Sequence, residues 1–125
     1  MRALLLAIFM LSFAYHSRAD NWVCPNPEDE FCDSYHAEFI ANQAHKRMNE
    51  VYKKLLSDYP TKKEQQPTII AQRAWLRYAD AHCAAILSKF AGATFTKAKM
   101  EYDCKSEQIN KRIDELKSYC ESCGK

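Results

Sequence analysis

Apolar residues recur every three to five positions along most of the chain, which predicts amphipathic helices rather than strands. A first helix is expected to begin near Asp33 or Ser34, either of which can cap it, and to end near Tyr59, because Pro60 follows. Its apolar face consists of Tyr35, Phe39, Ala44, Met48, Val51, Leu55 and Tyr59. Polar residues occupy much of the opposite side, so one face of this helix should be buried.

Two further helices are predicted from the same periodicity. The second should run from Thr68 to about Ala91 and stop at Gly92, with an apolar stripe formed by Ala71, Ala74, Trp75, Tyr78, His82, Ala85, Ile86 and Phe90. The third should be capped by Thr94 or Thr96, with a stripe formed by Tyr102, Ile109, Ile113, Leu116 and Cys120. Three helices of about 24 residues with short connections predict an all-α fold, a single up-down-up bundle.

The polar segment between the first two helices supports two interpretations. Thr61 and Glu64 match a capping box, which starts a helix. Pro67 should restrict a helix begun there to about one turn, because proline lacks the N–H that a helix interior needs. A plain loop is the alternative, and the pattern does not separate the two.

The first 19 residues are expected to be a signal peptide rather than part of the fold. Arg2 supplies the positive start, an apolar run extends to Ala14, and Ser17 and Ala19 are the small residues that precede a cleavage site. The apolar run has about twelve residues, fewer than the roughly 20 that span a membrane. We therefore expect one domain over residues 20–125, periplasmic or secreted, with no stable membrane insertion after cleavage.

Removal of the signal peptide also removes Arg2 and Arg18, which lowers the Lys+Arg count of 18 to match the 16 Asp and Glu residues. The mature chain is then close to neutral, which argues against a nucleic acid as its partner. Carboxylates are dense at Glu28, Asp29 and Glu30, in an irregular segment before the first helix. This cluster is the candidate partner contact, and a solvated lead-in to the helix is the alternative.

Export places the six cysteines in an oxidising compartment, where disulfides are the default. Cys83 and Cys104 lie at about equal height on adjacent antiparallel helices, so they should bridge the second helix to the third. The other four cysteines are near neighbours in two pairs, one at each end of the bundle. The expected disulfides are Cys24–Cys32, Cys83–Cys104 and Cys120–Cys123.

Cys120 and Cys123 also form a C-x-x-C sequence, the one candidate redox motif. Reactive pairs of this kind usually open a helix, where the positive end of the dipole stabilises the thiolate, whereas this pair closes one. A structural disulfide is therefore the preferred interpretation. No His pair has the spacing of a helical metal site, and no Ser lies in a nucleophile-elbow motif, so we predict no metal, cofactor or catalytic residue.

Three short motifs follow one another along the predicted helices. They are N-x-x-Y in the first, A-Q-R-A-W followed by Asp and Cys in the second, and C-x7-R-x3-L in the third. Their residues are Asn49, Tyr52, Gln72, Arg73, Trp75, Asp80, Cys83, Cys104, Arg112 and Leu116. Together with the paired N-terminal cysteines, this ordered set resembles the LprI-like lysozyme-inhibitor family of secreted bacterial proteins over residues 24–116. The sequence departs from that family at Ala79, where Arg is usual.

Physical roles follow for these motif residues within a bundle. Trp75 should anchor the core midway along the second helix, and Gln72 and Arg73 should hydrogen-bond to neighbouring helices. The bundle arrangement alone predicts a partly buried pair between Asp80 and Arg112.

The resemblance implies a binding protein rather than an enzyme, whose namesake activity is the inhibition of lysozyme by protein–protein contact. A neutral chain would attract a basic lysozyme through a local acidic patch. Two alternatives stay open: a structural or interaction protein of the envelope with another target, and a thiol–disulfide protein that uses Cys120 and Cys123.

Overall fold

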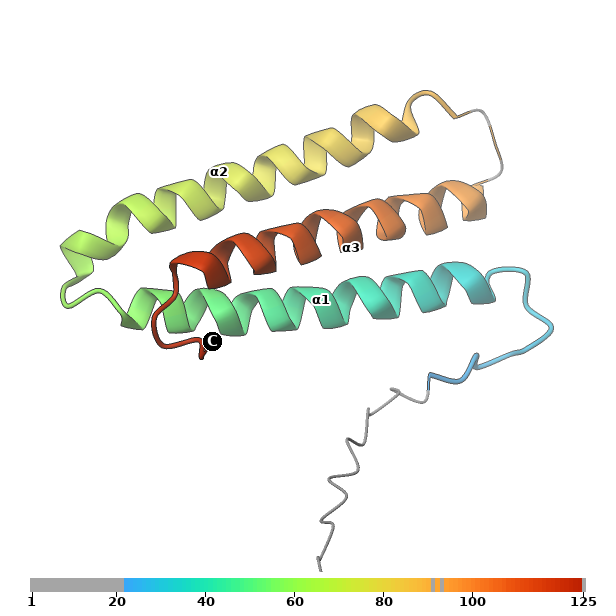
Figure 1. The fold of residues 1–125 in the computed structure, drawn as a ribbon. Coiled ribbons are helices and arrows are strands. Elements are labelled where there is room, and N and C mark those ends of the chain that lie inside the picture. The colour runs from blue at the N-terminus through green and yellow to red at the C-terminus, as the bar shows by residue number, and fades with distance from the viewer. Residues whose placement is uncertain (1–21, 91, 93, 125) are drawn as a thin grey trace, which may run out of the picture.

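The structure, a computed structural model, describes residues 22–90, 92 and 94–124, and the expected signal peptide lies outside them. Within these residues the chain forms three helices and no strand: α1 Cys32–Ser57, α2 Lys62–Leu87 and α3 Thr94–Tyr119. Successive helices run in opposite directions, so the expected all-α, up-down-up bundle is confirmed (Figure 1). α3 packs against both other helices, whereas α1 and α2 barely touch. None of the helices in this described part is long and apolar enough to cross a membrane.

The core of the bundle is the contact between α1 and α3. Its buried side chains are Ala44, Met48 and Leu55 from one side and Ile109, Ile113, Leu116 and Cys120 from the other. Burying a Leu or Met fully contributes about 1.5–3 kcal/mol relative to leaving it in water, so this seam supplies much of the stability. The stripe predicted for the third helix is confirmed from Ile109 to Cys120, and Tyr102 is half-buried. Near the start of α1, Ala37 and Ala41 are buried in place of the predicted Tyr35, which is 45% exposed.

The prediction of which face of the second helix is buried is wrong. α2 instead buries Gln72, Ala79 and Cys83. Of the predicted stripe, Trp75 and His82 are half-buried, whereas the exposed members are Ala71, Ala74, Tyr78, Ala85, Ile86 and Phe90. The buried face is made of a glutamine, an alanine and a disulfide, and these add little to the apolar signal that periodicity detects.

α2 begins at Lys62, well before the predicted Thr68. Thr61 is the N-cap residue, and its Oγ1 accepts a hydrogen bond from the Glu64 N–H at 3.3 Å. The same hydroxyl donates to Glu64 Oε2 at 2.7 Å. The capping-box interpretation of this segment is therefore confirmed.

The expectation that Pro67 would limit this helix to one turn is wrong. Pro67 removes a single main-chain hydrogen bond, and the helix continues through it. The side-chain amide of Gln65 donates to the Leu56 carbonyl at 2.9 Å, which ties these first turns to the end of α1. At its other end α2 stops at Leu87, earlier than the predicted Ala91. Just beyond Leu87, the N–H groups of Lys89 and Phe90 donate to carbonyls three residues earlier, instead of four as in an α-helix.

All six cysteines are paired, as Cys24–Cys32, Cys83–Cys104 and Cys120–Cys123, which are the pairs expected from the helix arrangement. The second of these links α2 to α3, and Cys83 is fully buried. Because α2 buries few side chains, this covalent link is a large part of what holds α2 in place.

The C-terminal residues fold back on the end of α1. The Asp58 carboxylate accepts hydrogen bonds from the N–H groups of Glu121 at 2.7 Å and Ser122 at 3.2 Å. The Ser122 hydroxyl donates to the Lys54 carbonyl at 3.1 Å. Hydrogen bonds from Ser122 and from the backbone of Glu121 lower the pKa of Asp58 below its usual 3.8.

Replacement of both Cys83 and Cys104 by Ala should lower the free energy of unfolding by about 3 kcal/mol, because the bond closes a 21-residue separation in the unfolded chain. The same replacement of Cys120 and Cys123, three residues apart, should cost about 2 kcal/mol or less. Urea unfolding of each oxidised variant, followed by circular dichroism, compares the two. A larger loss for the C-terminal pair would contradict this account of how α2 is held.

Asp58→Asn should lower the melting temperature near neutral pH and matter less in acid. The pKa of Asp58 is lowered on folding, so its stabilising effect is present above the unfolded value of 3.8 and is lost as the pH falls through the folded value. The difference in melting temperature between wild type and variant should therefore shrink below about pH 4. Thermal unfolding followed across the acid range measures it, and a difference that grows in acid would refute the proposed bonding.

Candidate functional site

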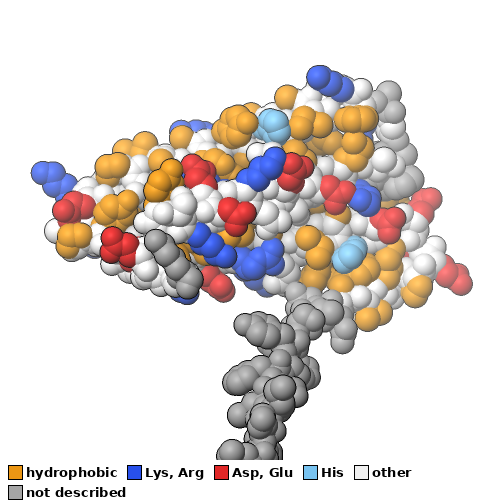
Figure 2. Space-filling view, in the orientation of Figure 1, with side chains coloured by type: hydrophobic (Ala, Val, Ile, Leu, Met, Phe, Trp, Pro, Cys, Tyr) orange, Lys and Arg blue, Asp and Glu red, His pale blue; other side chains and the backbone are white. Residues whose placement is uncertain are grey.

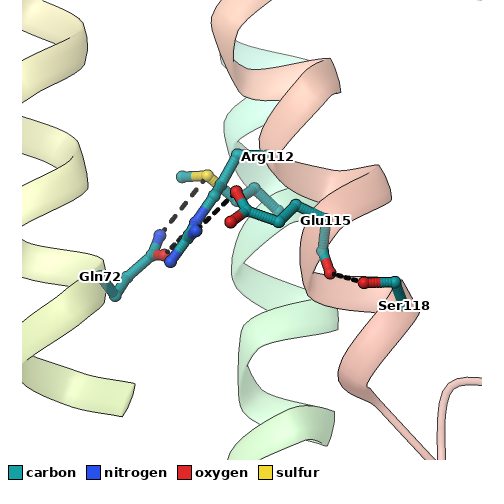
Figure 3. Close-up of polar contacts among 5 residues, drawn as sticks. Gln72, Arg112, Glu115 and Ser118 are labelled. Carbon is teal, nitrogen blue, oxygen red and sulfur yellow. Dashed lines mark hydrogen bonds and ion pairs between the residues drawn. The ribbon is translucent and has the colours of Figure 1, made fainter. Parts of the chain in front are cut away.

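Two groups of motif and charged residues come together in the structure, one buried and one exposed. The buried group lies between α2 and α3 (Figure 3). Gln72 is 4% exposed, and its Oε1 accepts a hydrogen bond from Arg112 Nε at 2.9 Å. Its amide nitrogen lies 3.6 Å from Met48 Sδ. Gln72 therefore links α2 to both other helices.

The guanidinium of Arg112 is held from several directions. Its Nη1 donates to Glu115 Oε2 at 2.7 Å, and its central carbon lies 5.6 Å from the centre of the Trp75 ring. Burial of a charge is costly unless the charge is paired and hydrogen-bonded, and Arg112, which is 8% exposed, is both. The arrangement stabilises the α2–α3 contact and explains why Gln72, Trp75 and Arg112 occur together.

The expected pair between Asp80 and Arg112 is wrong. The Asp80 side chain is 75% exposed and lies 4.0 Å from Lys105 Nζ, which is itself bound to Glu101 at 2.6 Å. Arg112 lies level with Gln72, and Asp80 is about two helical turns further along α2, beyond the reach of the guanidinium.

The remaining motif residues differ in burial. Leu116 is in the core and Tyr52 packs against it. Asn49 and Arg73 are exposed, and Arg73 has none of the expected hydrogen bonds to another helix among the described residues. No contact among the described residues therefore explains why Asn49 and Arg73 occur at these positions.

The exposed group is an acidic segment, which we define as residues 22–44. It contains the predicted cluster Glu28, Asp29 and Glu30, and it also contains Asp33 and Glu38. It has no Lys or Arg over its whole length. Asp33 and Glu38 are not among the contact residues predicted from the sequence, although the absence of Lys and Arg from residues 22–44 is a signal that can be read there. The Cys24–Cys32 disulfide closes its first part into a loop.

Within this loop one of the three predicted carboxylates forms backbone contacts, and the other two are exposed. Asp29 builds the turn into α1: its Oδ1 accepts from the Phe31 N–H at 2.9 Å and its carbonyl accepts from the Cys32 N–H at 3.0 Å. Glu28 and Glu30 on either side are exposed. Asp29 is thus a positioning residue, and its two neighbours present their charge to solvent.

The same turn corrects the predicted start of the first helix. Phe31 is the N-cap residue, with no side-chain cap, and Asp33 and Ser34 lie inside α1. The Ser34 hydroxyl donates to the Phe31 carbonyl at 2.7 Å. The turn made by Asp29 leads the chain into the helix slightly earlier than a side-chain cap at Asp33 or Ser34 would.

Aromatic and aliphatic side chains accompany the carboxylates at this end. Trp22 stacks on His36, with ring centres 4.6 Å apart. Phe31, Tyr35 and Ile40 are 38%, 45% and 40% exposed. Figure 2 shows hydrophobic side chains gathered over the start of α1, with acidic side chains at the edge of the patch. Aromatic groups ringed by charge are typical of protein-binding surfaces.

The described residues contain no group of three or more His, Cys, Asp or Glu that could hold a metal ion. The C-x-x-C pair is a disulfide at the C-terminal end of α3, and Cys120 is only 4% exposed. Burial at a helix C-terminus favours a structural rather than an exchangeable disulfide.

Arg112→Ala should lower the free energy of unfolding by about 3 kcal/mol, because it leaves the buried Gln72 carbonyl without its donor. Glu115→Ala should cost less, about 1 kcal/mol, because the Glu115 side chain is 49% exposed and Arg112 keeps its hydrogen bond to the buried Gln72. Urea unfolding of both oxidised variants tests the ranking. Equal losses would show that the ion pair, rather than the buried amide, is what holds Arg112.

No curated protein and no solved structure matches the chain at a significant level. Residues 35–116 match the family model described as "Lysozyme inhibitor LprI". That range holds all the motif residues in the three helices and most of the sequence, and the chain therefore belongs to the LprI lysozyme-inhibitor family.

Proposed function

We propose that this protein is exported to the periplasm or beyond, where it binds a lysozyme by protein–protein contact and inhibits it without catalysing a reaction. Membership of the lysozyme-inhibitor family supports the class of partner. The three disulfides support an oxidising compartment. The single domain over residues 20–125, released from its signal peptide, is part of the same proposal.

The observation that carries the proposal is the acidic segment. Its carboxylates lie next to exposed aromatic side chains, three of them on the loop closed by the Cys24–Cys32 disulfide and two in the first turns of α1. A basic enzyme would be attracted by the charge and held by the apolar contacts. A closed loop also loses less conformational entropy on binding than an open one.

An envelope protein with another target is the main alternative, and the same surface would serve it. A thiol–disulfide activity at Cys120 and Cys123 is the less favoured alternative, because Cys120 is buried where the disulfide joins the core. Titration of the oxidised protein into a lysozyme activity assay, paired with calorimetric binding, separates these functions. Saturable inhibition with a matching dissociation constant supports inhibition, and no binding across several lysozyme types refutes it.

Reversal of charge at Glu28→Lys/Glu30→Lys should weaken lysozyme binding by about tenfold or more, mainly by slowing association. The effect should diminish as salt is raised, because exposed charges are screened over about 10 Å at 0.1 M salt. The matched control is Glu50→Lys/Glu121→Lys, which makes the same change at exposed positions outside the acidic segment. Association and dissociation rates from surface plasmon resonance measure both. Equal weakening by the control would show that net charge alone drives binding.

A further inference from the structure

A groove of about 300 Å³ lies between the first turns of α1 and the early part of α3. Asp33, His36 and Ile40 line it from α1, and Lys99, Asp103 and Ser106 line it from α3. Asp33 and His36 belong to the acidic segment, so the groove opens beside the proposed contact surface. Pockets of this kind are where the anchoring side chains of a partner protein insert.

The charges that line this groove are unequal. Lys99 Nζ is bound to Asp103 Oδ2 at 2.6 Å. Asp33 is exposed and has no ion-pair partner among the described residues, although its field contributes to the raised pKa of Lys99. The groove therefore presents two carboxylates and one ammonium group, and it favours a further cation.

The floor of the groove provides a second, independent observation. Ser106 is 9% exposed, and its hydroxyl oxygen is buried with no hydrogen-bond partner among the described residues. Buried polar groups almost always have a partner, because an unsatisfied one costs about 1–3 kcal/mol. The Ser106 hydroxyl is therefore a hydrogen-bonding group beside the groove that no described residue pairs with.

The adjoining groove along the same two helices gives a useful contrast. Arg47 and Glu50 line it from α1, and Asp114 and Lys117 line it from α3. Its basic and acidic side chains are matched in number, so it has no preference for a cation.

We infer that the groove between Asp33, Asp103 and Ser106 receives an arginine side chain of the partner protein. A guanidinium has five N–H donors in a planar fork, so it can bind a carboxylate and a hydroxyl at once. Asp33 would bind one edge of the guanidinium while Asp103 keeps Lys99, and the Ser106 oxygen would accept a hydrogen bond. This inference rests on the proposed function for the identity of the partner, but the groove itself can be tested without a lysozyme.

The first experiment measures lysozyme binding by calorimetry. Asp33→Asn should weaken binding by about tenfold and Ser106→Ala by about threefold, whereas Asp114→Asn in the adjoining groove should change it by less than twofold. Ser106→Ala should also leave the melting temperature unchanged or raise it, because it removes an unsatisfied group. If wild type binds and Asp33→Asn behaves like Asp114→Asn, the inference fails while the proposed function stands.

The second experiment is independent of lysozyme. N-acetylarginine amide is titrated into the ¹⁵N-labelled, oxidised protein, with the uncharged N-acetylcitrulline amide as the control. Saturable shifts at the amides of Asp33, Asp103 and Ser106 with the arginine compound alone support the inference. Equal responses to both compounds, or none, overturn it. If lysozyme does not bind at all, the proposed function fails and this titration alone decides the inference.

Discussion

The apolar contact between α1 and α3 is the interaction on which the rest of the structure depends. It buries Met48, Leu55 and Leu116, and it aligns the start of α1 with the start of α3. α2 contributes little to this core and is attached to it by the Gln72–Arg112 hydrogen bond and the Cys83–Cys104 disulfide. The same alignment places the acidic segment of α1 beside Asp103 and Ser106 of α3, so the packing that stabilises the bundle also forms the groove.

The features of the fold that depend on apolar spacing or helix register could be predicted from the sequence. The stripe from Ile109 to Cys120 and the bridge between Cys83 and Cys104 are of this kind, because both follow from helical geometry. The apolar periodicity did not predict the buried face of α2, since Gln72 is polar; the expected hydrogen bond from Gln72 to a neighbouring helix is confirmed by its contact with Arg112. α2 continues through Pro67 because the Thr61 cap and the contact of Gln65 with α1 outweigh one lost hydrogen bond. The contact with α1 cannot be predicted from the sequence of α2 alone.

Only part of the candidate site could be predicted from the sequence, because the roles of its residues depend on contacts that the fold creates. Glu28, Asp29 and Glu30 stand out because they are consecutive, but their separate roles depend on a turn that only the fold shows. Ser106 gives no sequence signal, since a serine in a helix is usually solvated. Lys53 and Lys54 near the end of α1 and Lys62 and Lys63 at the start of α2 lie at the opposite end of the bundle, while Lys97 and Lys99 begin α3 beside the acidic segment. A chain that is nearly neutral as a whole therefore has one segment, residues 22–44, that carries carboxylates and no Lys or Arg, which reconciles its composition with a basic partner.

Hydrogen exchange of the oxidised protein, with and without a saturating lysozyme, tests the central claim most directly. We expect slowed exchange of main-chain amides at residues 22–44 and 99–106, and unchanged exchange along the outer face of α2 around Tyr78. Protection confined to α2 would show that the partner binds the exposed apolar residues of that helix. That result would contradict the assignment of the acidic segment as the binding surface.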